Sequence, residues 1–297
     1  MTAKQKIIAT GLSGMVGSRV AQLLSADYNF VDFSLDTHVD ILDYPNLNNS
    51  FISHNDAKAV IHFAGFTDTN AAWLQRGDKT GLCYRLNVEG TKNILDLCQK
   101  HSKYLIYIST DFVFDGQKRG AYTENDDPNP IEWYGQTKYL GEKIILESGI
   151  PAAVTRIAFP YRADYQLKKD IVRKIIDGFR AGKLYPQWTD QLTTPTFVDD
   201  IAYGLKYLLT QKSTGIFHLV GSSSQSPYDL CQVIAEVFGF DKSIIQPSTL
   251  VGYQASQSPG SRPWQANLSL SNQKISELGI FMKTIKEGLA TLKEQTS

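Results

Sequence analysis

The stretch TGLSGMVG, residues 10–17, decides the fold. It follows a short apolar segment, Ile7–Thr10, and leads into Val16–Leu24, where apolar residues recur at helical spacing. Three glycines permit a tight turn, a close approach of backbone to a pyrophosphate, and close packing of a helix on a strand. The stretch therefore predicts a strand, a tight turn, and a helix whose first amides hold phosphate groups.

Strand-like and helix-like patterns alternate from this turn to about residue 157. The expected strands are 7–10, 30–33, 59–64, 104–110 and 152–157, and the expected helices are 47–53, 86–100 and 133–147. Such alternation is typical of an α/β fold with a Rossmann-type, doubly wound parallel sheet. We therefore predict a dinucleotide-binding domain over residues 1–160.

The alternation loosens after residue 160, which favours a smaller C-terminal substrate-binding lobe over residues 161–297. A helix over 197–209 and a strand over 215–220 are expected to return to the main sheet, so that 197–222 rejoins the first domain. Ser226 followed by Pro227 predicts the start of a helix that runs to Gly239.

Charge and composition exclude several classes of function. The 30 basic and 30 acidic side chains cancel, so no long-range field draws the chain to nucleic acid or anionic lipid. No segment reaches the ~20 apolar residues of a membrane span, and the N-terminus is too short in apolar residues for a signal peptide. Three scattered cysteines show no metal spacing. We expect a cytoplasmic protein with reduced thiols and no bound metal.

The end of the second expected strand bears on which nicotinamide coenzyme binds. An acidic side chain there binds the ribose diol of NAD and repels the extra phosphate of NADP. By spacing from Gly17 the selecting position is Ser34, which excludes neither coenzyme, while Asp32 and Asp36 are equally consistent with solvated residues. The sequence thus allows NADP or NAD, with a slight preference for NADP.

Tyr134 and Lys138 lie four residues apart in an expected helix, and therefore on one face of it. An ammonium near a phenol is expected to lower the pKa of the tyrosine and make it usable as a proton donor or acceptor. Tyr139/Lys143 and Tyr165/Lys169 share this spacing, which is equally consistent with a solvated pair. Tyr134 is favoured because it follows a strand ending at Thr110, whose hydroxyl could polarise a carbonyl.

These residues resemble the extended short-chain dehydrogenase/reductases, and within them the dTDP-4-dehydrorhamnose reductase group. The resemblance extends over nearly the whole chain. Besides the glycine turn, the motifs that show the resemblance are HVDILD at 38–43, NVEGT at 87–91, STDFVFDG at 109–116 and YGQTKYLGE at 134–142. Downstream, the subgroup is indicated by Asp190-Gln191, Pro195-Thr196, GIFHLVG at 215–221 and Arg262-Pro263.

The resemblance implies a role for each matched position. Its catalytic positions are Thr110, Tyr134 and Lys138. Its coenzyme-binding positions are Gly11, Ser13, Gly14, Met15, Val16, Ser34, Asp40, Ile41, Ala64, Gly65, Asn87 and Lys138. Its substrate-binding positions are Thr110, Phe112, Phe159 and Arg262, the last near the diphosphate of a nucleotide-sugar.

The chain also departs from the group's pattern. Phe112 replaces a tyrosine, Phe159 replaces a tryptophan near the sugar, and Arg19 replaces a glutamate that can help bind an intersubunit metal. The loop from Asn70 to Tyr84 is longer than usual and carries Trp73. The resemblance still allows a homodimer, but it does not fix the sugar.

Three hypotheses follow. The leading one is NAD(P)H-dependent reduction of a 4-keto group on a nucleotide-sugar. The second is a nucleotide-sugar epimerase or dehydratase, which the phenylalanine after Asp111 disfavours because dehydratases of this kind carry an acid pair there. The third is a non-catalytic regulatory or binding subunit on the same fold, as the regulatory subunit of methionine adenosyltransferase resembles this group.

Overall fold

A six-stranded sheet forms the centre of the protein in the computed structural model, which describes residues 4–296. Its order is β2-β1-β3-β4-β5-β9. The bounds are β1 Gln5–Thr10, β2 Tyr28–Phe33, β3 Ala59–His62, β4 Tyr104–Thr110, β5 Ala152–Ile157 and β9 Gly215–His218. β1 pairs in parallel with β2 on one side and with β3 on the other, and β3 pairs in parallel with β4. The α/β, doubly wound fold is confirmed. β9, within the strand expected over 215–220, lies beside β5 at one edge of the sheet.

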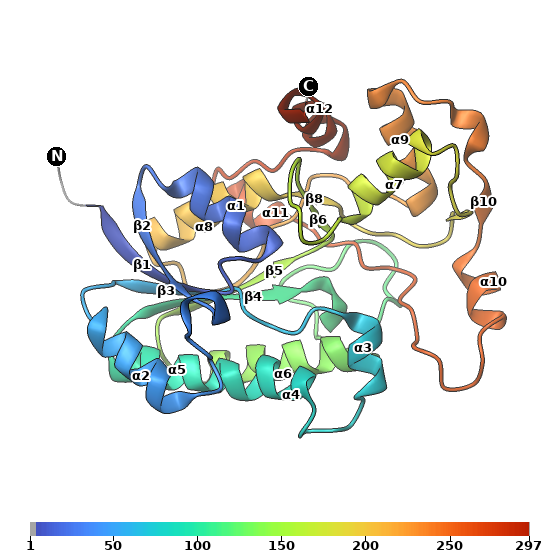
Figure 1. Cartoon of the computed structure of the whole chain (residues 1–297). Coiled ribbons are helices and arrows are strands. Elements are labelled where there is room, and N and C mark those ends of the chain that lie inside the picture. Colours follow the sequence, from blue (N-terminus) through green and yellow to red (C-terminus); the bar gives the residue numbers. More distant parts are fainter. Residues whose placement is uncertain (1–3, 297) are drawn as a thin grey trace. The chain divides into compact units, whose positions relative to one another are not determined.

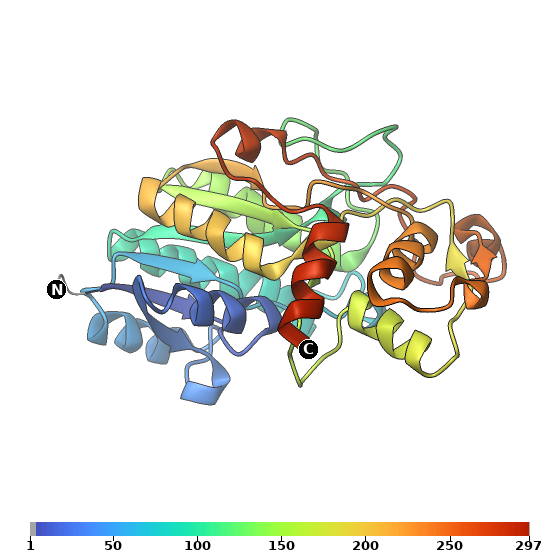
Figure 2. The ribbon, with the colours of Figure 1, turned by 90° about the horizontal axis from the view of Figure 1, so that it is seen from above.

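Helices cover both faces of the sheet. On one face lie α2 Tyr44–Ser53, α5 Thr91–Lys100 and α6 Trp133–Glu147; on the other lie α1 Met15–Leu24 and α8 Val198–Gln211 (Figures 1 and 2). Every residue of β4 is buried, because a strand covered on both faces has no solvent side. This explains why residues 104–108 of β4 are apolar without alternation, before the strand ends in the buried polar residues Ser109 and Thr110.

The helix expected over 86–100 differs from the prediction at its start. Residues Arg85–Gly90 form a π-helical segment, and α5 begins only at Thr91. A Cβ on Gly90 would come within 2.5 Å of the Ile41 side chain, so a larger residue there would displace that side chain. Wide turns of this kind are frequent at functional sites.

The chain divides into two compact units, each built from separate segments. The first comprises the described part of residues 1–113, with 132–156 and 202–217; the second comprises 114–131, 157–201 and the described part of 218–297. The expected boundary at residue 160 therefore does not coincide with the units. Segment 114–131 joins the second unit because the Tyr122 amide donates to the Ser269 carbonyl (2.8 Å) and the His218 amide donates to the Glu124 carboxylate (2.9 Å). The functional assignment of the two parts stays a prediction.

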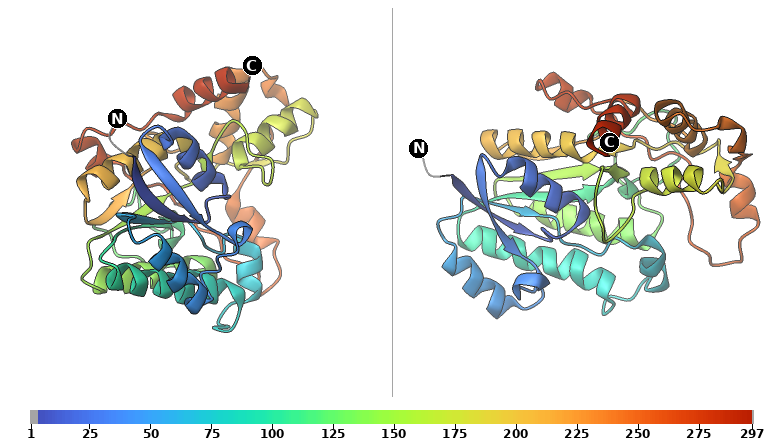
Figure 3. Two further views of the ribbon diagram at one scale, coloured as in Figure 1. Left: turned by 60° about the vertical axis from the view of Figure 1, so that its left-hand side comes forward. Right: turned by 45° about the horizontal axis from the view of Figure 1, so that its top comes forward.

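The second unit has its own apolar core, in which α9 Pro227–Phe238 packs against α7 Ile171–Arg180 and α12 Ile285–Thr296 (Figure 3). The start of α9 is as predicted: the Ser226 hydroxyl accepts from the Asp229 amide (3.0 Å), and Pro227 opens the first turn. Gly239 ends the helix at φ 75°, a conformation that glycine adopts without strain.

The remaining elements are short. They are α3 Thr69–Leu74, α4 Leu82–Tyr84, β6 Pro160–Tyr161, β7 Gln187–Trp188, β8 Thr196–Phe197, β10 Pro247–Ser248, α10 Leu250–Ala255, α11 Gln273–Glu277, and the 3₁₀ turns Leu35–Thr37, Asp111–Val113 and Lys242–Ile244. Between residues 4 and 296, none of the helices has the length and apolar run needed to span a lipid bilayer.

Candidate active site

The start of α6 is fixed by its own cap and by close packing. The buried Glu132 side chain accepts from the amides of Tyr134 (3.0 Å) and Gly135 (2.5 Å), which a carboxylate at a helix N-terminus does well. A Cβ on Gly135 would lie 2.1 Å from the Phe112 carbonyl oxygen, so only glycine fits where α6 meets the turn after β4. The rings of Phe112 and Tyr134 meet edge to face at 5.7 Å. Tyr134 is thus held beside the carboxyl end of β4.

Thr110 and Asp111 end that strand as a bonded pair. The Thr110 hydroxyl donates to Asp111 Oδ1 (2.8 Å) and accepts from the Phe112 amide (3.2 Å). Within residues 4–296, Asp111 Oδ2 is buried and has no hydrogen-bond partner. Burial raises the pKa of Asp111 to about 7, against the lowering effect of its hydrogen bond with Thr110. The carboxyl group therefore holds a proton more tightly than an ordinary aspartate.

Lys138 is buried one turn further along α6. Its ammonium donates to the Ile108 carbonyl (2.7 Å) and lies 4.0 Å from the centre of the Tyr107 ring. Burial lowers the pKa of Lys138 to about 7, opposed by the negative charge of Glu142. The amine therefore loses its proton more readily than that of an ordinary lysine.

The expected lowering of the Tyr134 pKa by Lys138 is wrong. Burial raises the pKa of Tyr134, and a hydrogen bond with Thr110 only partly opposes that rise. The ammonium of Lys138 is committed to the Ile108 carbonyl, and desolvation of the phenol dominates. In this structure Tyr134 is a protonated hydroxyl at neutral pH and a weaker acid than an ordinary tyrosine.

A buried ion pair fixes α6 to the sheet below these residues. Arg156 in β5 donates from Nε to Glu142 Oε1 (3.0 Å) and from Nη2 to Oε2 (2.7 Å), and both residues are fully buried. Such a bidentate contact fixes the orientation of the two side chains as well as the distance between them. The face of α6 that carries Tyr134 and Lys138 is therefore aligned with β4 and β5.

The glycine turn has the geometry that a dinucleotide requires. Gly11 has φ +64°, and a Cβ there would lie 2.8 Å from the backbone of Ala64, just beyond the carboxyl ends of the paired strands β1 and β3, where the strand order of the sheet reverses. Gly14 occupies the N-cap of α1 and has no side chain to cover the first amides, so a phosphate can approach them. The predicted positions Gly11, Ser13 and Gly14 lie in this turn, and Met15 and Val16 begin α1. Ala64 lies against Gly11, whereas Gly65 lies near the side chains of Asn87 and Lys138.

The end of β2, where the sequence predicts coenzyme selection, is followed by an exposed turn. The Ser34 hydroxyl donates to Asp32 Oδ2 (2.9 Å), and Thr37 closes the turn through its own hydroxyl. Among the described residues, Asp32 Oδ1 is buried and has no partner, an acceptor that suits a ribose hydroxyl. Nearby, Asn93 donates to the Ile41 carbonyl (2.9 Å), and Asp40 accepts from the Leu42 amide (2.9 Å). The residues present therefore fit a dinucleotide.

Phe159 and Arg262 belong to the second unit. Phe159 adopts φ +40°, an unusual conformation for a residue with a side chain, and its carbonyl accepts from the Thr196 amide (3.2 Å). Arg262 is 8% exposed, with its guanidinium 3.7 Å from the centre of the Trp264 ring. Their roles in binding substrate stay predictions, as do those of Phe112 and Thr110.

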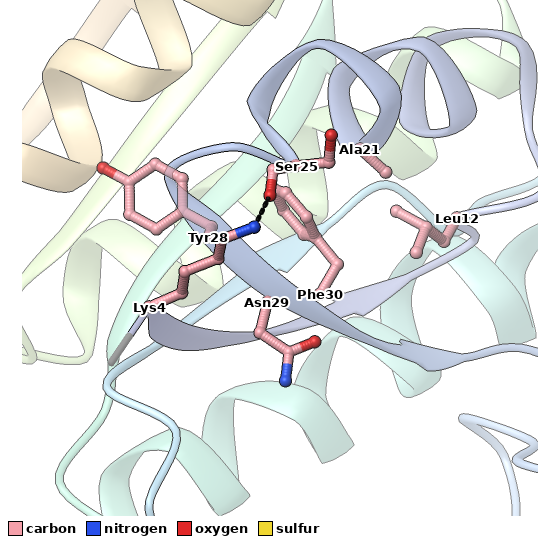
Figure 4. Close-up of a pocket in the computed structure, with 7 residues that line it drawn as sticks. All are labelled: Lys4, Leu12, Ala21, Ser25, Tyr28, Asn29 and Phe30. Carbon is pink, nitrogen blue, oxygen red and sulfur yellow. Dashed lines mark hydrogen bonds between the residues drawn. The ribbon is translucent and has the colours of Figure 1, made fainter. Parts of the chain in front are cut away.

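Hollows in the first unit lie apart from Tyr134. One of about 620 Å³ lies between β1, β2 and α1, where Lys4 donates to the Ser25 carbonyl (2.7 Å) (Figure 4). It shares Leu12 with the glycine turn and includes none of the three catalytic candidates. A second hollow, of about 370 Å³, includes Asp32 and Thr37 at the end of β2. Neither hollow contains Thr110, Tyr134 or Lys138, so the candidate site is defined by its chemistry.

Sequence reasoning missed three buried polar residues at this site. Glu132 immediately precedes an expected helix and could have been identified as its cap. His62 stands in the otherwise apolar segment AVIHFA, a signal that its side chain has polar partners. The raised pKa of Asp111 has no sequence signal, because it depends on burial. Within residues 4–296 no cluster of three or more potential metal ligands is found.

A glycine turn at β1 together with threonine, tyrosine and lysine around β4 and α6 defines the class of extended short-chain dehydrogenase/reductases. More narrowly, the model of the RmlD substrate binding domain family matches residues 5–297, and the chain belongs to that family.

Three similar proteins show how far the likeness extends. The chain is 29% identical to the probable low-salt glycan biosynthesis reductase Agl14 of Haloferax volcanii, with 95% of each chain covered. It is 29% identical to methionine adenosyltransferase 2 subunit beta of Rattus norvegicus, with 96% of this chain and 87% of that protein covered. The crystal structure of dTDP-4-dehydrorhamnose reductase from Bacillus anthracis in complex with NADP matches with a TM-score of 0.88 at 23% identity. The match covers 99% of this chain and 100% of that chain. The last likeness supports the fold.

Proposed function

We propose that this protein is an oxidoreductase that uses NADPH or NADH to reduce the 4-keto group of a nucleotide-sugar, as dTDP-4-dehydrorhamnose reductases do. The observation that carries the proposal is the placing of Tyr134 and Thr110 together at the carboxyl end of β4, in the unit that holds the glycine turn. Family membership and the NADP complex of the Bacillus anthracis protein support it.

Each residue has a role in this reaction. Tyr134, which is protonated at neutral pH, donates its proton to the carbonyl oxygen as hydride reaches the carbonyl carbon. Thr110, whose hydroxyl donates to Asp111 Oδ1 in this structure, turns that proton to the same carbonyl oxygen when substrate binds and stabilises the charge that develops there. The coenzyme, when bound, supplies hydride to the carbonyl carbon. Lys138 holds the coenzyme ribose, and Gly11, Gly14 and the first turn of α1 hold its phosphates.

The test is a parallel assay with NADPH and with NADH. Purified protein is mixed with a panel of 4-keto nucleotide-sugars that includes dTDP-4-dehydrorhamnose, and loss of reduced-nicotinamide absorbance is followed. Turnover of at least one keto-sugar, dependent on the protein, is expected. Absence of turnover with the whole panel, in a protein that binds the coenzyme, would overturn the proposal.

A second candidate is a regulatory subunit, favoured by the match to methionine adenosyltransferase 2 subunit beta over 96% of this chain. Its test is co-expression with a methionine adenosyltransferase, followed by size-exclusion chromatography. A stable complex without keto-sugar turnover would favour this candidate. A cytoplasmic location, a homodimer and the absence of nucleic-acid partners stay predictions.

A further inference from the structure

A buried polar chain runs through His62, the last residue of β3. His62 is fully buried, with Nδ1 2.6 Å from the Thr10 hydroxyl and Nε2 3.1 Å from the Thr91 hydroxyl. Thr10 ends β1 just before the glycine turn, and Thr91 begins α5. The imidazole thus bridges two elements that are 81 positions apart in the sequence.

The neighbouring hydrogen bonds fix the direction of this chain. Thr91 donates its one hydroxyl proton to the Asn87 carbonyl (2.8 Å), so toward His62 it accepts, and Nε2 must carry the proton. Thr10 accepts from the Ala64 amide (3.2 Å) and has its own proton to give to Nδ1. Every bond is satisfied by a neutral imidazole protonated on Nε2. Burial, reinforced by the positive charge of Lys138, lowers the pKa of His62 to about 3, which keeps the ring neutral.

The two ends of the chain meet different parts of the proposed site. At one end, Ala64 lies against Gly11 of the glycine turn. At the other, Asn87 accepts from the Phe66 amide (2.7 Å) and donates to the Thr137 hydroxyl (2.9 Å). Thr137 lies in α6 between Tyr134 and Lys138.

We propose that His62 is a positioning residue that, through its Nε2–H tautomer, aligns the glycine turn by way of Thr10 and the start of α6 by way of Thr91 and Asn87. The roles given to the glycine turn and to the start of α6 rest on the proposed function, whereas the hydrogen bonds through His62 do not. The alternative is that His62 only fulfils the hydrogen bonds of buried polar groups. In that case its variants would lower stability and would not affect kcat and the dissociation constant of NADPH differently.

The tautomer is tested directly by nuclear magnetic resonance of ¹⁵N-labelled protein. Long-range ¹H–¹⁵N spectra at neutral pH distinguish a protonated Nε2 from a protonated Nδ1, and comparison with His62→Gln assigns the signal among the five histidines. A signal typical of a neutral ring protonated on Nε2 is expected. A ring protonated on Nδ1 or on both nitrogens would overturn the proposed direction of the hydrogen bonds through His62.

Two variants separate the halves of the chain. In His62→Asn the shorter amide oxygen lies near the position of Nδ1 and still accepts from Thr10; in His62→Gln the longer amide nitrogen lies near Nε2 and still donates to Thr91. His62→Asn is expected to lower kcat about tenfold with the dissociation constant of NADPH within about twofold. His62→Gln is expected to weaken NADPH binding about tenfold, with a smaller change in kcat.

Matched variants check the assignment. Thr91→Val should reproduce His62→Asn, and Thr10→Val should reproduce His62→Gln, because each removes the same bond from the other side. Cys98→Ala, in the same apolar core but outside the chain, should lower the melting temperature and leave both constants unchanged. If both histidine variants changed kcat and NADPH affinity in equal proportion, the histidine would be structural only. Should the wild-type protein reduce no keto-sugar, the tautomer and the NADPH affinities still decide the proposal.

Discussion

The start of α6 and the end of β2 both belong to the first unit, yet they are built differently. At the start of α6, Glu132 and Lys138 are buried. Burial raises the pKa of Tyr134 and lowers that of Lys138. At β2, the turn Leu35–Thr37 is exposed and closed by its own hydroxyls. The difference teaches that the proposed reacting groups lie in a buried, closely packed framework, whereas the proposed coenzyme-selecting residues lie beside an exposed turn, where side chains can be exchanged at little cost.

The largest effect is expected at α6. Tyr134→Phe removes the proton donor and should lower kcat by about 10³, within the range of general acid catalysis, with NADPH binding nearly unchanged. Steady-state kinetics and a fluorescence titration of the coenzyme measure both. Tyr139→Phe, which shares the tyrosine-lysine spacing, is the control and should retain full activity. Equal loss in the two variants would refute the assignment of Tyr134.

The second effect concerns the buried carboxyl beside it. The pKa of Asp111 is raised to about 7 in the folded protein from 3.8, so the folded state binds this proton more tightly than the unfolded state. Its contribution to stability is full below about pH 4 and is lost as pH rises to 7.

This gives a measurable difference between wild type and Asp111→Asn. From pH 5 to pH 7 the free energy of unfolding of the wild type should fall by roughly 2 kcal/mol relative to the variant. Urea denaturation at the two pH values measures it, and the other carboxylates cancel in the comparison. Parallel curves for the two proteins would show that Asp111 titrates normally.

A third, smaller effect is expected at the end of β2. Ser34→Asp places a second carboxylate beside Asp32, where it should repel the extra phosphate of NADP and shift the preference towards NADH about tenfold. The ratio of kcat/KM for the two coenzymes measures the shift. Ser34→Ala is the control, and a preference unchanged by the added charge would place the coenzyme-selecting position elsewhere.

The smallest effect tests whether the turn after β2 influences kcat as well as stability. Thr37→Val removes hydrogen bonds to the Asp32 carbonyl and from the Ser34 amide in an exposed turn. A loss of about 0.5–1 kcal/mol in the free energy of unfolding is expected, with kcat unchanged. A large drop in kcat would show that the two regions are coupled, contrary to the comparison above.

Local patterns were enough for much of the fold. The strands over 104–110 and 152–157 and the helix over 133–147 have the predicted bounds, because their apolar runs and periodicity are properties of neighbouring residues. The π-helical segment at Arg85–Gly90 was missed, since its composition matches that of an ordinary helix. The same limit applies to segment 114–131, which pairs with residues about 94 to 147 positions away.

By itself the sequence determined the alternating α/β order, the glycine turn at residues 10–17, and the spacing that brings Tyr134 and Lys138 to one face of a helix. Only the tertiary structure decided that Tyr134 keeps its proton, that Lys138 approaches neutrality, and that His62 connects Thr10 with Thr91. The physical reason is that periodicity is encoded in adjacent residues, whereas desolvation and the direction of a hydrogen bond depend on which distant groups fold around a side chain.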